Sequence, residues 1–274
     1  INNIVARSGA DRGIRILQRD TDATIREQTF LFDPTTGTGD LGTRFVIADF
    51  DGDGNTEILT GDGDGDLWIS EHRFGSYTQT WLSLGDGDTR WIGGGTDIDN
   101  DGKIEFAVAR ATTDNNDEFN GFWDLEIYSM TGPDTYAIEW ATRITGVAAT
   151  GNGIISGDAD GDGRDDLIVC LRPDLYVFRS DTPNFYRPVW HTEISLMHRP
   201  MLADLDTDGL PEILFNNNDA IRIVERSEPA FTVVSPQIIT ARPLGISTVE
   251  IDWMQTPEAT TYRIYRAIGN ASLT

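Results

Sequence analysis

The chain has 274 residues, and the 39% that are hydrophobic are enough to form a substantial buried core. Its 45 Asp and Glu residues against 21 Lys and Arg give a net charge of -24, which excludes partners such as nucleic acid and anionic membrane surfaces. No apolar run of 18 residues is present, so no membrane-spanning helix is predicted, and the single cysteine, Cys170, excludes an internal disulfide.

Four Asp-rich segments divide the chain at regular intervals. They fit the pattern D-x-D-x-D-G-x-x-[DE] and begin at Asp49, Asp97, Asp158 and Asp204, which lie 48, 61 and 46 residues apart. A buried-strand pattern follows each one, too short and too β-branched for a helix. Two further strands can be read after it, as in DLWIS and TQTWLSL. Such units predict an all-β fold, a β-propeller of four-stranded blades.

The blades follow one another in chain order. We assign them to residues 1–40, 41–90, 91–148, 149–197 and 198–228. The first unit aligns with the second and third strands of a later blade, which puts Ile1 at the seventh position of a loop of the same kind. We therefore expect a further Asp-rich loop upstream of Ile1, and a propeller that is longer than this chain.

Each Asp-rich loop carries the donor set of a calcium site. Asp at positions 1, 3 and 5, a backbone carbonyl at position 7 and an acid at position 9 supply hard oxygen ligands, while Gly at position 6 permits a sharp turn. Without a cation, two carboxylates ~4 Å apart repel by on the order of 4 kcal/mol at an effective dielectric constant of ~20. An EF-hand is excluded because its position 12 requires Glu, whereas Thr60, Val108, Val169 and Phe215 stand there.

We therefore predict about four Ca²⁺ ions, one in each complete loop, with a structural role. The predicted ligands, in chain order, are Asp49, Asp51, Asp53, Asn55, Glu57, Asp97, Asp99, Asp101, Lys103, Glu105, Asp158, Asp160, Asp162, Arg164, Asp166, Asp204, Asp206, Asp208, Leu210 and Glu212. Two other acidic runs, at 62–66 and 86–88, lack the Gly at position 6 and the acid at position 9. We interpret these two runs as hairpin turns.

Seven tryptophans suggest two different roles. Those at 68, 81, 91, 140 and 190 lie on predicted strands, where we expect them to pack between blades. Trp123 instead follows a polar insertion at 111–122, which accounts for the longest spacing between loops. Phe119, Phe122 and Trp123 are a candidate ligand platform, for example for sugar stacking. The alternative is an insertion folded back onto its own blade.

The loops resemble the FG-GAP/VCBS repeat, the calcium-loop β-propeller repeat of integrin α-subunit heads. The resemblance covers residues 1–228 and rests on the four loops, in which Asp49, Asp51, Asp53, Glu57 and their counterparts match the family's ligand positions. It implies a propeller that usually has seven blades. The Phe-Gly and Gly-Ala-Pro signatures of the integrin version are weak or missing, which favours a secreted bacterial or archaeal type.

Residues 237–274 resemble the start of a fibronectin type III domain. IITARPL, STVEIDWM and TTYRIYRA read as its first three strands, and Trp253 and Tyr262 fall where that family places core aromatic residues. A complete sandwich needs roughly 100 residues, so we expect this domain to be truncated here. Residues 229–236, which begin and end with Pro, are the predicted linker.

These features favour a non-enzymatic extracellular module, used for adhesion, for binding a carbohydrate or protein, or as a scaffold beside further domains of the same chain. None of the three histidines lies in a zinc-like motif and no catalytic motif is present, so no catalytic residue is predicted. One alternative is the propeller scaffold of a rhamnogalacturonan-type polysaccharide lyase, which would need a cleft lined by basic residues, and these are scarce. Another is a structural component of a surface layer or extracellular filament.

Overall fold

The computed structural model describes residues 3–8, 13–19, 24–31, 41–85, 87, 89, 91–111, 121–146, 152–194, 199–217, 220–225, 238–243 and 249–253. Every regular element in these ranges is a β-strand, which confirms the predicted all-β class. The same ranges contain no helix that could cross a membrane.

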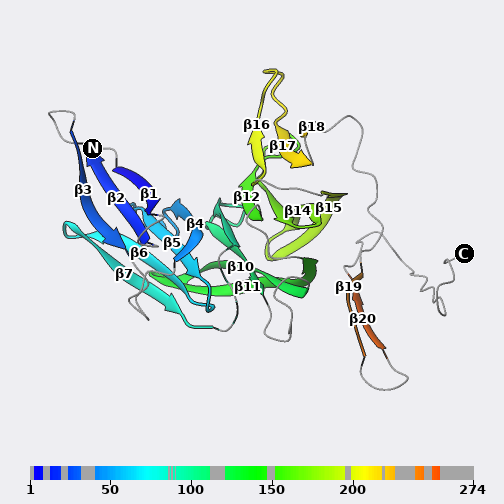
Figure 1. Cartoon of the computed structure of the whole chain (residues 1–274), viewed down its shortest axis with the longest axis horizontal. Coiled ribbons are helices and arrows are strands. Elements are labelled where there is room, and N and C mark those ends of the chain that lie inside the picture. Colours follow the sequence, from blue (N-terminus) through cyan, green and yellow to red (C-terminus); the bar gives the residue numbers. More distant parts are fainter. Residues whose placement is uncertain are drawn as a thin grey trace, which may run out of the picture.

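The strands within these ranges form six antiparallel sheets, and each sheet uses strands that are consecutive in the chain (Figure 1). The first sheet holds β1 (Asn3–Ser8), β2 (Gly13–Arg19) and β3 (Ile25–Leu31). The second holds β4 (Leu41–Ala48), β5 (Glu57–Asp62), β6 (Leu67–Arg73) and β7 (Ser76–Ser83). The third holds β8 (Trp91–Thr96), β9 (Glu105–Ala111), β10 (Gly121–Gly132) and β11 (Thr135–Gly146).

The fourth sheet holds β12 (Gly153–Gly157), β13 (Asp166–Leu171), β14 (Asp174–Thr182) and β15 (Phe185–Glu193). The fifth holds β16 (Met201–Ala203), β17 (Glu212–Asn217) and β18 (Ala220–Val224). The second, third and fourth sheets are thus four-stranded blades, as predicted. In Figure 1 the first five sheets follow an open arc in chain order.

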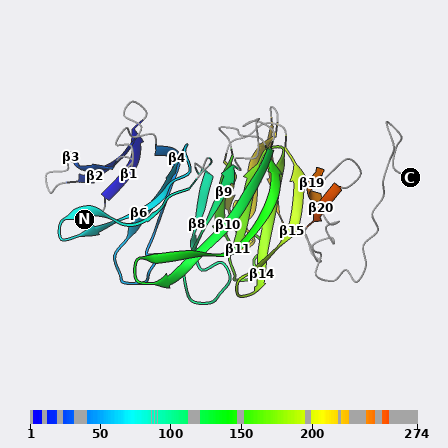
Figure 2. The same ribbon diagram turned by 90° about the horizontal axis from the view of Figure 1, so that it is seen from below.

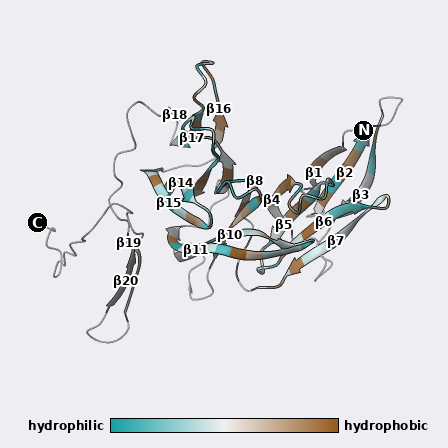
Figure 3. Ribbon diagram, turned by 180° about the vertical axis from the view of Figure 1, so that it is seen from behind, coloured by the Kyte–Doolittle hydropathy of each residue, from teal (hydrophilic) through white to brown (hydrophobic). Residues whose placement is uncertain are grey.

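The blades stack side by side in chain order (Figure 2). Each of the four apolar clusters among the described residues lies between two successive sheets. Strand β13 shows how the sequence achieves this. Leu167, Val169 and Leu171 enter the cluster shared with the third sheet, whereas Ile168 and Cys170 enter the cluster shared with the fifth. A strand that is buried on both faces reads as a continuous apolar run, and Figure 3 shows such hydrophobic segments along the strands.

A register shift recurs in three blades, beside a tryptophan. The third and fourth strands shift register after Ile69, Ile127 and Val177, each of which pairs with a Trp. These are Trp81, Trp140 and Trp190. Each Trp packs against a core cluster, and Trp68 and Trp91 are buried, which confirms that these five tryptophans pack between blades. Trp81, Trp140 and Trp190 each follow a β-bulge by one residue, so this Trp position is a second repeated feature of the blades, in addition to the Asp-rich loops.

Strands β19 (Ile238–Pro243) and β20 (Val249–Trp253) pair as an antiparallel hairpin. They coincide with the first two strands of the predicted fibronectin-like segment. Phe119, Tyr262 and the linker at 229–236 lie outside the described residues. The fibronectin type III assignment therefore stays a prediction.

The first strands of successive blades lie side by side, with β8 between β4 and β12. The glycines in WIGGGT allow this close approach. A Cβ on Gly93 would lie 2.2 Å from the carbonyl oxygen of Ile154 on β12. On the other side, Gly95 has a φ of +98° and a Cβ there would lie 2.9 Å from Val46 Cγ1 on β4. Because main-chain atoms cannot yield as a flexible side chain can, this strand needs glycine for packing.

We expect Gly93→Ala to destabilise the chain by about 1–3 kcal/mol, because the added methyl overpacks the contact between β8 and β12. Gly132→Ala is the matched control, since a Cβ at Gly132 would meet nothing within 4 Å. Urea unfolding of both variants measures the difference. Equal unfolding free energies would contradict the proposed role of Gly93.

Candidate metal centre

Each Asp-rich loop joins the first strand of a sheet to the second, and position 9 is the first residue of that second strand. These position 9 acids are Glu57, Glu105, Asp166 and Glu212, and all four are at least 96% buried. Position 12 lies inside the strand in each case, which confirms that the loops are not EF-hands. The fold therefore buries the position 9 acid of every loop, and in the second and third loops it also buries the position 3 acid, Asp99 and Asp160.

The four loops share one pattern of hydrogen bonds. The Gly amide at position 6 donates to Oδ2 of the position 1 Asp at 3.0, 3.1, 2.8 and 3.1 Å. The amide at position 7 donates to Oδ1 of the position 5 Asp at 2.8–3.0 Å. The amide at position 2 donates to the position 9 carboxylate at 2.5, 2.7, 3.3 and 2.7 Å. These bonds fix the carboxylates around one centre. The carbonyls at position 7 as calcium ligands stay a prediction.

The carboxylates of each loop converge, and some of their buried oxygens face no donor. Carboxylate oxygens of positions 1, 3, 5 and 9 lie within 4.8 Å of one another in the first two loops, as do those of positions 1, 3 and 5 in the last two. Among the described residues, Asp49 Oδ1, Glu57 Oε1 and Glu105 Oε1 are buried without a hydrogen-bond partner. Buried carboxylate oxygens require a cation or a donor. The donor set is all oxygen, which fits Ca²⁺.

Burial also shifts the protonation of the position 9 acids. Desolvation raises the pKa of Glu57 to about 8 and that of Glu105 to about 9, and neighbouring loop carboxylates add to the shift. The same causes raise the pKa of Asp166 to about 7. A divalent cation among these carboxylates would favour their ionised form.

The next blade contacts the first two loops, a feature that the sequence alone did not indicate. The amide of Asp134, in the turn between β10 and β11, donates to Oδ2 of Asp51 at 3.3 Å. The amide of Asn184, in the turn between β14 and β15, donates to Oδ2 of Asp99 at 2.6 Å. Both donors have positive φ, 51° and 61°. Each of these loops is therefore completed at the junction between two blades.

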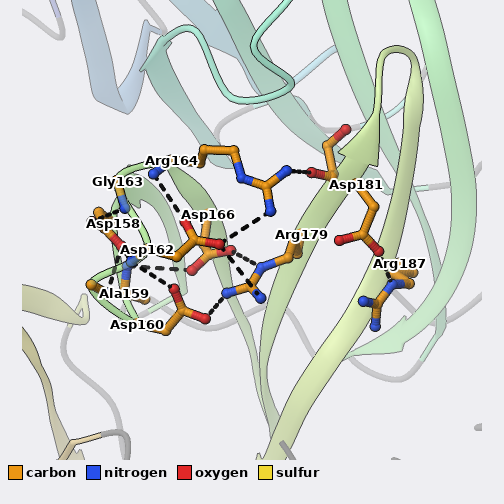
Figure 4. A network of polar contacts seen from close by, with 12 residues as sticks. Asp158, Ala159, Asp160, Asp162, Gly163, Arg164, Asp166, Arg179, Asp181 and Arg187 are labelled. Atoms are coloured by element: carbon orange, nitrogen blue, oxygen red, sulfur yellow. Dashed lines mark hydrogen bonds and ion pairs between the residues drawn. The ribbon is translucent and has the colours of Figure 1, made fainter. Parts of the chain in front are cut away.

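The third loop differs because an arginine enters it (Figure 4). Arg179 on β14 forms ion pairs with Asp160, with Asp162 at 3.7 Å and with Asp166 at 3.3 Å. Its side chain is 12% exposed, and those of Asp160 and Asp166 are 0% and 2% exposed. The guanidinium thus supplies buried positive charge to three carboxylates of one loop, whereas the cations that reach the first two loops, Arg73 at 3.8 Å from Asp53 and Lys103 at 2.7 Å from Asp101, are more exposed and contact one loop acid each.

Strand register explains why this occurs in one loop only among the described blades. In each sheet, one residue of the third strand lies opposite the position 9 acid that begins the second strand. The register is given by the pair Glu57–Glu71 and, one residue further along, by the pairs Phe106–Tyr128, Leu167–Phe178 and Ile213–Val224. The residues opposite position 9 are therefore Glu71, Ser129, Arg179 and Glu225. A cationic residue therefore stands at this position only in the fourth sheet, and sequence comparison at this offset could have found it.

A further acid, Glu139, was missed by sequence reasoning. It is the extra residue at the register shift of the third sheet, and it accepts a hydrogen bond from Tyr186 Oη at 2.6 Å. Burial raises its pKa, and the charges of Asp99 and Asp101 raise it further, which places Glu139 beside the second loop. No motif marks it, because only the β-bulge brings it there.

The prediction of Trp123 as part of an exposed ligand platform is wrong. Its indole is 2% exposed and packs edge-to-face on Trp91, with ring centroids 4.7 Å apart. The residue lies in β10, paired with Ala111 of β9 and Ile144 of β11, so it faces the core between two blades. The side chain of Phe122 and all of Phe119 lie outside the described residues.

The acidic run at 62–66 is the hairpin turn between β5 and β6, as predicted. Asp86 and Asp88 lie outside the described residues. His191 Nε2 lies 2.6 Å from Asp174 Oδ1, and His72 packs against Tyr77, so both side chains make local contacts on their own blades.

Comparison with known proteins agrees with this geometry. Residues 97–169 match the model of the FG-GAP-like repeat. The match begins at the first Asp of the second loop, includes the whole third loop and ends within β13, so it covers more than one period of the repeat. A search of curated proteins found no match.

Among solved structures, the chain is similar to BBS1N in a crystal of its complex with ARL6DN, soaked with mercury. The TM-score is 0.51 and the sequence identity 12%, over 81% of this chain and 64% of that chain. The chain therefore spans less than two thirds of the length of that neighbour. At this identity the similarity shows the fold alone, which is a β-propeller.

In calcium-free buffer, we expect the melting temperature to fall as the pH rises from 5 towards 8. Folded Glu57 and Glu105 keep their protons up to about pH 8 and 9, whereas the unfolded chain releases them near their ordinary pKa of 4.5. The folded state binds more protons in this window, so the free energy of unfolding decreases with pH. Calorimetry at pH 5, 6.5 and 8 measures this, and Glu57→Gln should show a smaller fall. A melting temperature that rises across the window would contradict it.

Arg179→Gln should destabilise the calcium-free chain by about 3–5 kcal/mol, because it leaves buried carboxylates without their cation. Saturating calcium should recover part of this loss, since an ion can then replace the guanidinium. Arg187→Gln is the control: its ion pair with Asp181 is more exposed (Figure 4) and should contribute less than about 1 kcal/mol. Unfolding with urea, with and without calcium, compares them. Equal losses in the two variants would show that Arg179 has no special role.

Proposed function

We propose that this chain is a calcium-stabilised β-propeller that acts outside the cell as a binding, adhesion or scaffold module. The observation that carries the proposal is the set of buried carboxylate oxygens without donors in the first two loops. Four loops with one hydrogen-bond pattern, each at the same corner of its blade, support a repeated ion site. The match to the FG-GAP-like repeat, a type that is typical of extracellular and surface proteins and often binds calcium, supports it further.

In this proposal about four calcium ions bind, one in each complete loop. The ion would neutralise carboxylates that the fold holds together, and through Asp51 and Asp99 it would act on the turn of the next blade. The third loop would be the weakest site, because Arg179 must yield its ion pairs to the metal. Four ions would change the formal charge from -24 to -16, still strongly acidic.

The ligand class in this proposal is an extracellular carbohydrate or protein, and the acidic surface argues against nucleic acid. We propose no catalytic role. The polysaccharide lyase and surface-layer alternatives have no specific observation in their favour among the described residues. Calcium sites of modest affinity, with dissociation constants of ~10⁻⁴ M, would be filled at the ~1 mM calcium found outside cells.

Removing calcium should lower the melting temperature by roughly 10–20 °C. Each site of this affinity contributes about 1.4 kcal/mol at ~1 mM calcium, and each kcal/mol moves the midpoint of a domain of this size by about 2–4 °C. The measurement is thermal unfolding in calcium and in excess EGTA at neutral pH. Glu57→Gln should reduce the calcium-dependent shift by about a quarter, and Glu193→Gln, an exposed acid on β15, should leave it unchanged.

The same two samples should then be compared on a glycan array. We expect the calcium-loaded chain to bind and the chelated chain to lose that binding. An unchanged melting temperature in EGTA would overturn the calcium proposal. If the chain keeps both its melting temperature and its glycan binding in EGTA, it is instead a binding module that does not depend on calcium.

A further inference from the structure

A second kind of acidic cluster lies outside the Asp-rich repeats, in the turn between β5 and β6. One carboxylate oxygen from each of Asp62, Asp64 and Asp66 lies within 4.8 Å of the others. Asp62 is 0% exposed and Asp66 is 7% exposed, whereas Asp64 is at the surface. Two buried carboxylates beside a third are unlike an ordinary acidic turn, in which the side chains extend into water.

The turn fixes the two oxygens of Asp62 differently. Oδ1 accepts hydrogen bonds from the amides of Asp64, Gly65 and Asp66 at 3.2, 3.0 and 2.9 Å. Oδ2 is buried and has no hydrogen-bond partner in the part of the chain that the structure describes. Asp66 shares this arrangement in part, since its Oδ1 accepts from the amide of Gly85 at 3.2 Å.

Contacts from outside the turn prevent it from relaxing. Thr89, in the connection to the next blade, donates its amide to the carbonyl of Asp62 at 2.9 Å and its hydroxyl to that of Asp66 at 2.8 Å. Arg110 on β9 of that next blade donates to the carbonyl of Gly65 at 2.6 Å and pairs with Glu126 at 3.3 Å. The turn is therefore held between two blades, which keeps the carboxylates of Asp62, Asp64 and Asp66 close together.

We propose that this turn binds a divalent cation of the calcium type through Asp62 Oδ2 and the carboxylates of Asp64 and Asp66. Oxygen-only donors of negative charge select a hard cation. Three side-chain ligands leave more of the coordination shell to water than the repeat loops do, so the affinity is lower. The site lies at a different corner of the blade from the loop at 49–57, and it does not depend on that loop.

The test counts bound calcium by calorimetry and by metal analysis at saturating calcium, on the whole chain. Asp64→Asn removes an exposed ligand, and Asp62→Asn keeps an acceptor for the three amides. Each variant should lose one calcium equivalent, and the double variant should lose one as well, because both residues serve one ion. Asp49→Asn is the reference for a repeat loop, and combined with Asp64→Asn it should lose two equivalents. Glu193→Gln should lose none.

A full complement of calcium in both Asp64→Asn and Asp62→Asn would overturn the proposal and assign a proton to Asp62 Oδ2. This outcome is separate from failure of the repeat-loop sites, which Asp49→Asn reports. A crystal soaked in Tb³⁺ gives an independent reading. We expect an anomalous peak beside Asp62. If the electron density defines the Asp62 side chain but no anomalous peak lies beside it, the result counts against the site.

Discussion

The described structure depends on a carboxylate that is buried at the start of the second strand in each of the four sheets with an Asp-rich loop. In the first blade with a complete loop this residue is Glu57, and one of its oxygens binds the amide of Phe50 while the other faces no donor. A charged group in that place is costly unless a cation shares the site. The strand and the loop are therefore one unit, because the start of the strand can be buried only if a proton or a cation neutralises the carboxylate there.

This unit also joins the blades. The apolar clusters each draw on two successive sheets, so among the described residues the buried apolar side chains form shared cores between blades. At the rim of these clusters, the amides of Asp134 and Asn184 bind position 3 of the loop on the preceding blade. Hydrophobic packing therefore holds the faces together, and the acidic loops join the corners, so that both interactions act across the same junctions.

The loops look alike in sequence but differ in how their charge is balanced. In the third, Arg179 lies among the carboxylates, whereas in the first the residue at the same register position is Glu71. Glu71 is itself paired with Arg73, and Arg73 also contacts Asp134 of the next blade at 2.9 Å. A bound ion would therefore meet a different surrounding charge in the first loop and in the third.

The sequence by itself determined the strands, the four-stranded blade and the position of the acidic loops, because strand periodicity and loop spacing are local properties. Loop positions 1, 3 and 5 meet in all four loops, and position 9 joins them in the first two, so the convergence of the three Asp residues could be predicted from their spacing. Only the tertiary structure decided which oxygens lack a donor, where Arg179 lies and that Trp123 is buried. Those outcomes depend on residues that are distant in the chain, such as Asp51 and Asp134, which are 83 positions apart. The strand register and the stacking of blades bring them together, and neither can be read from one segment alone.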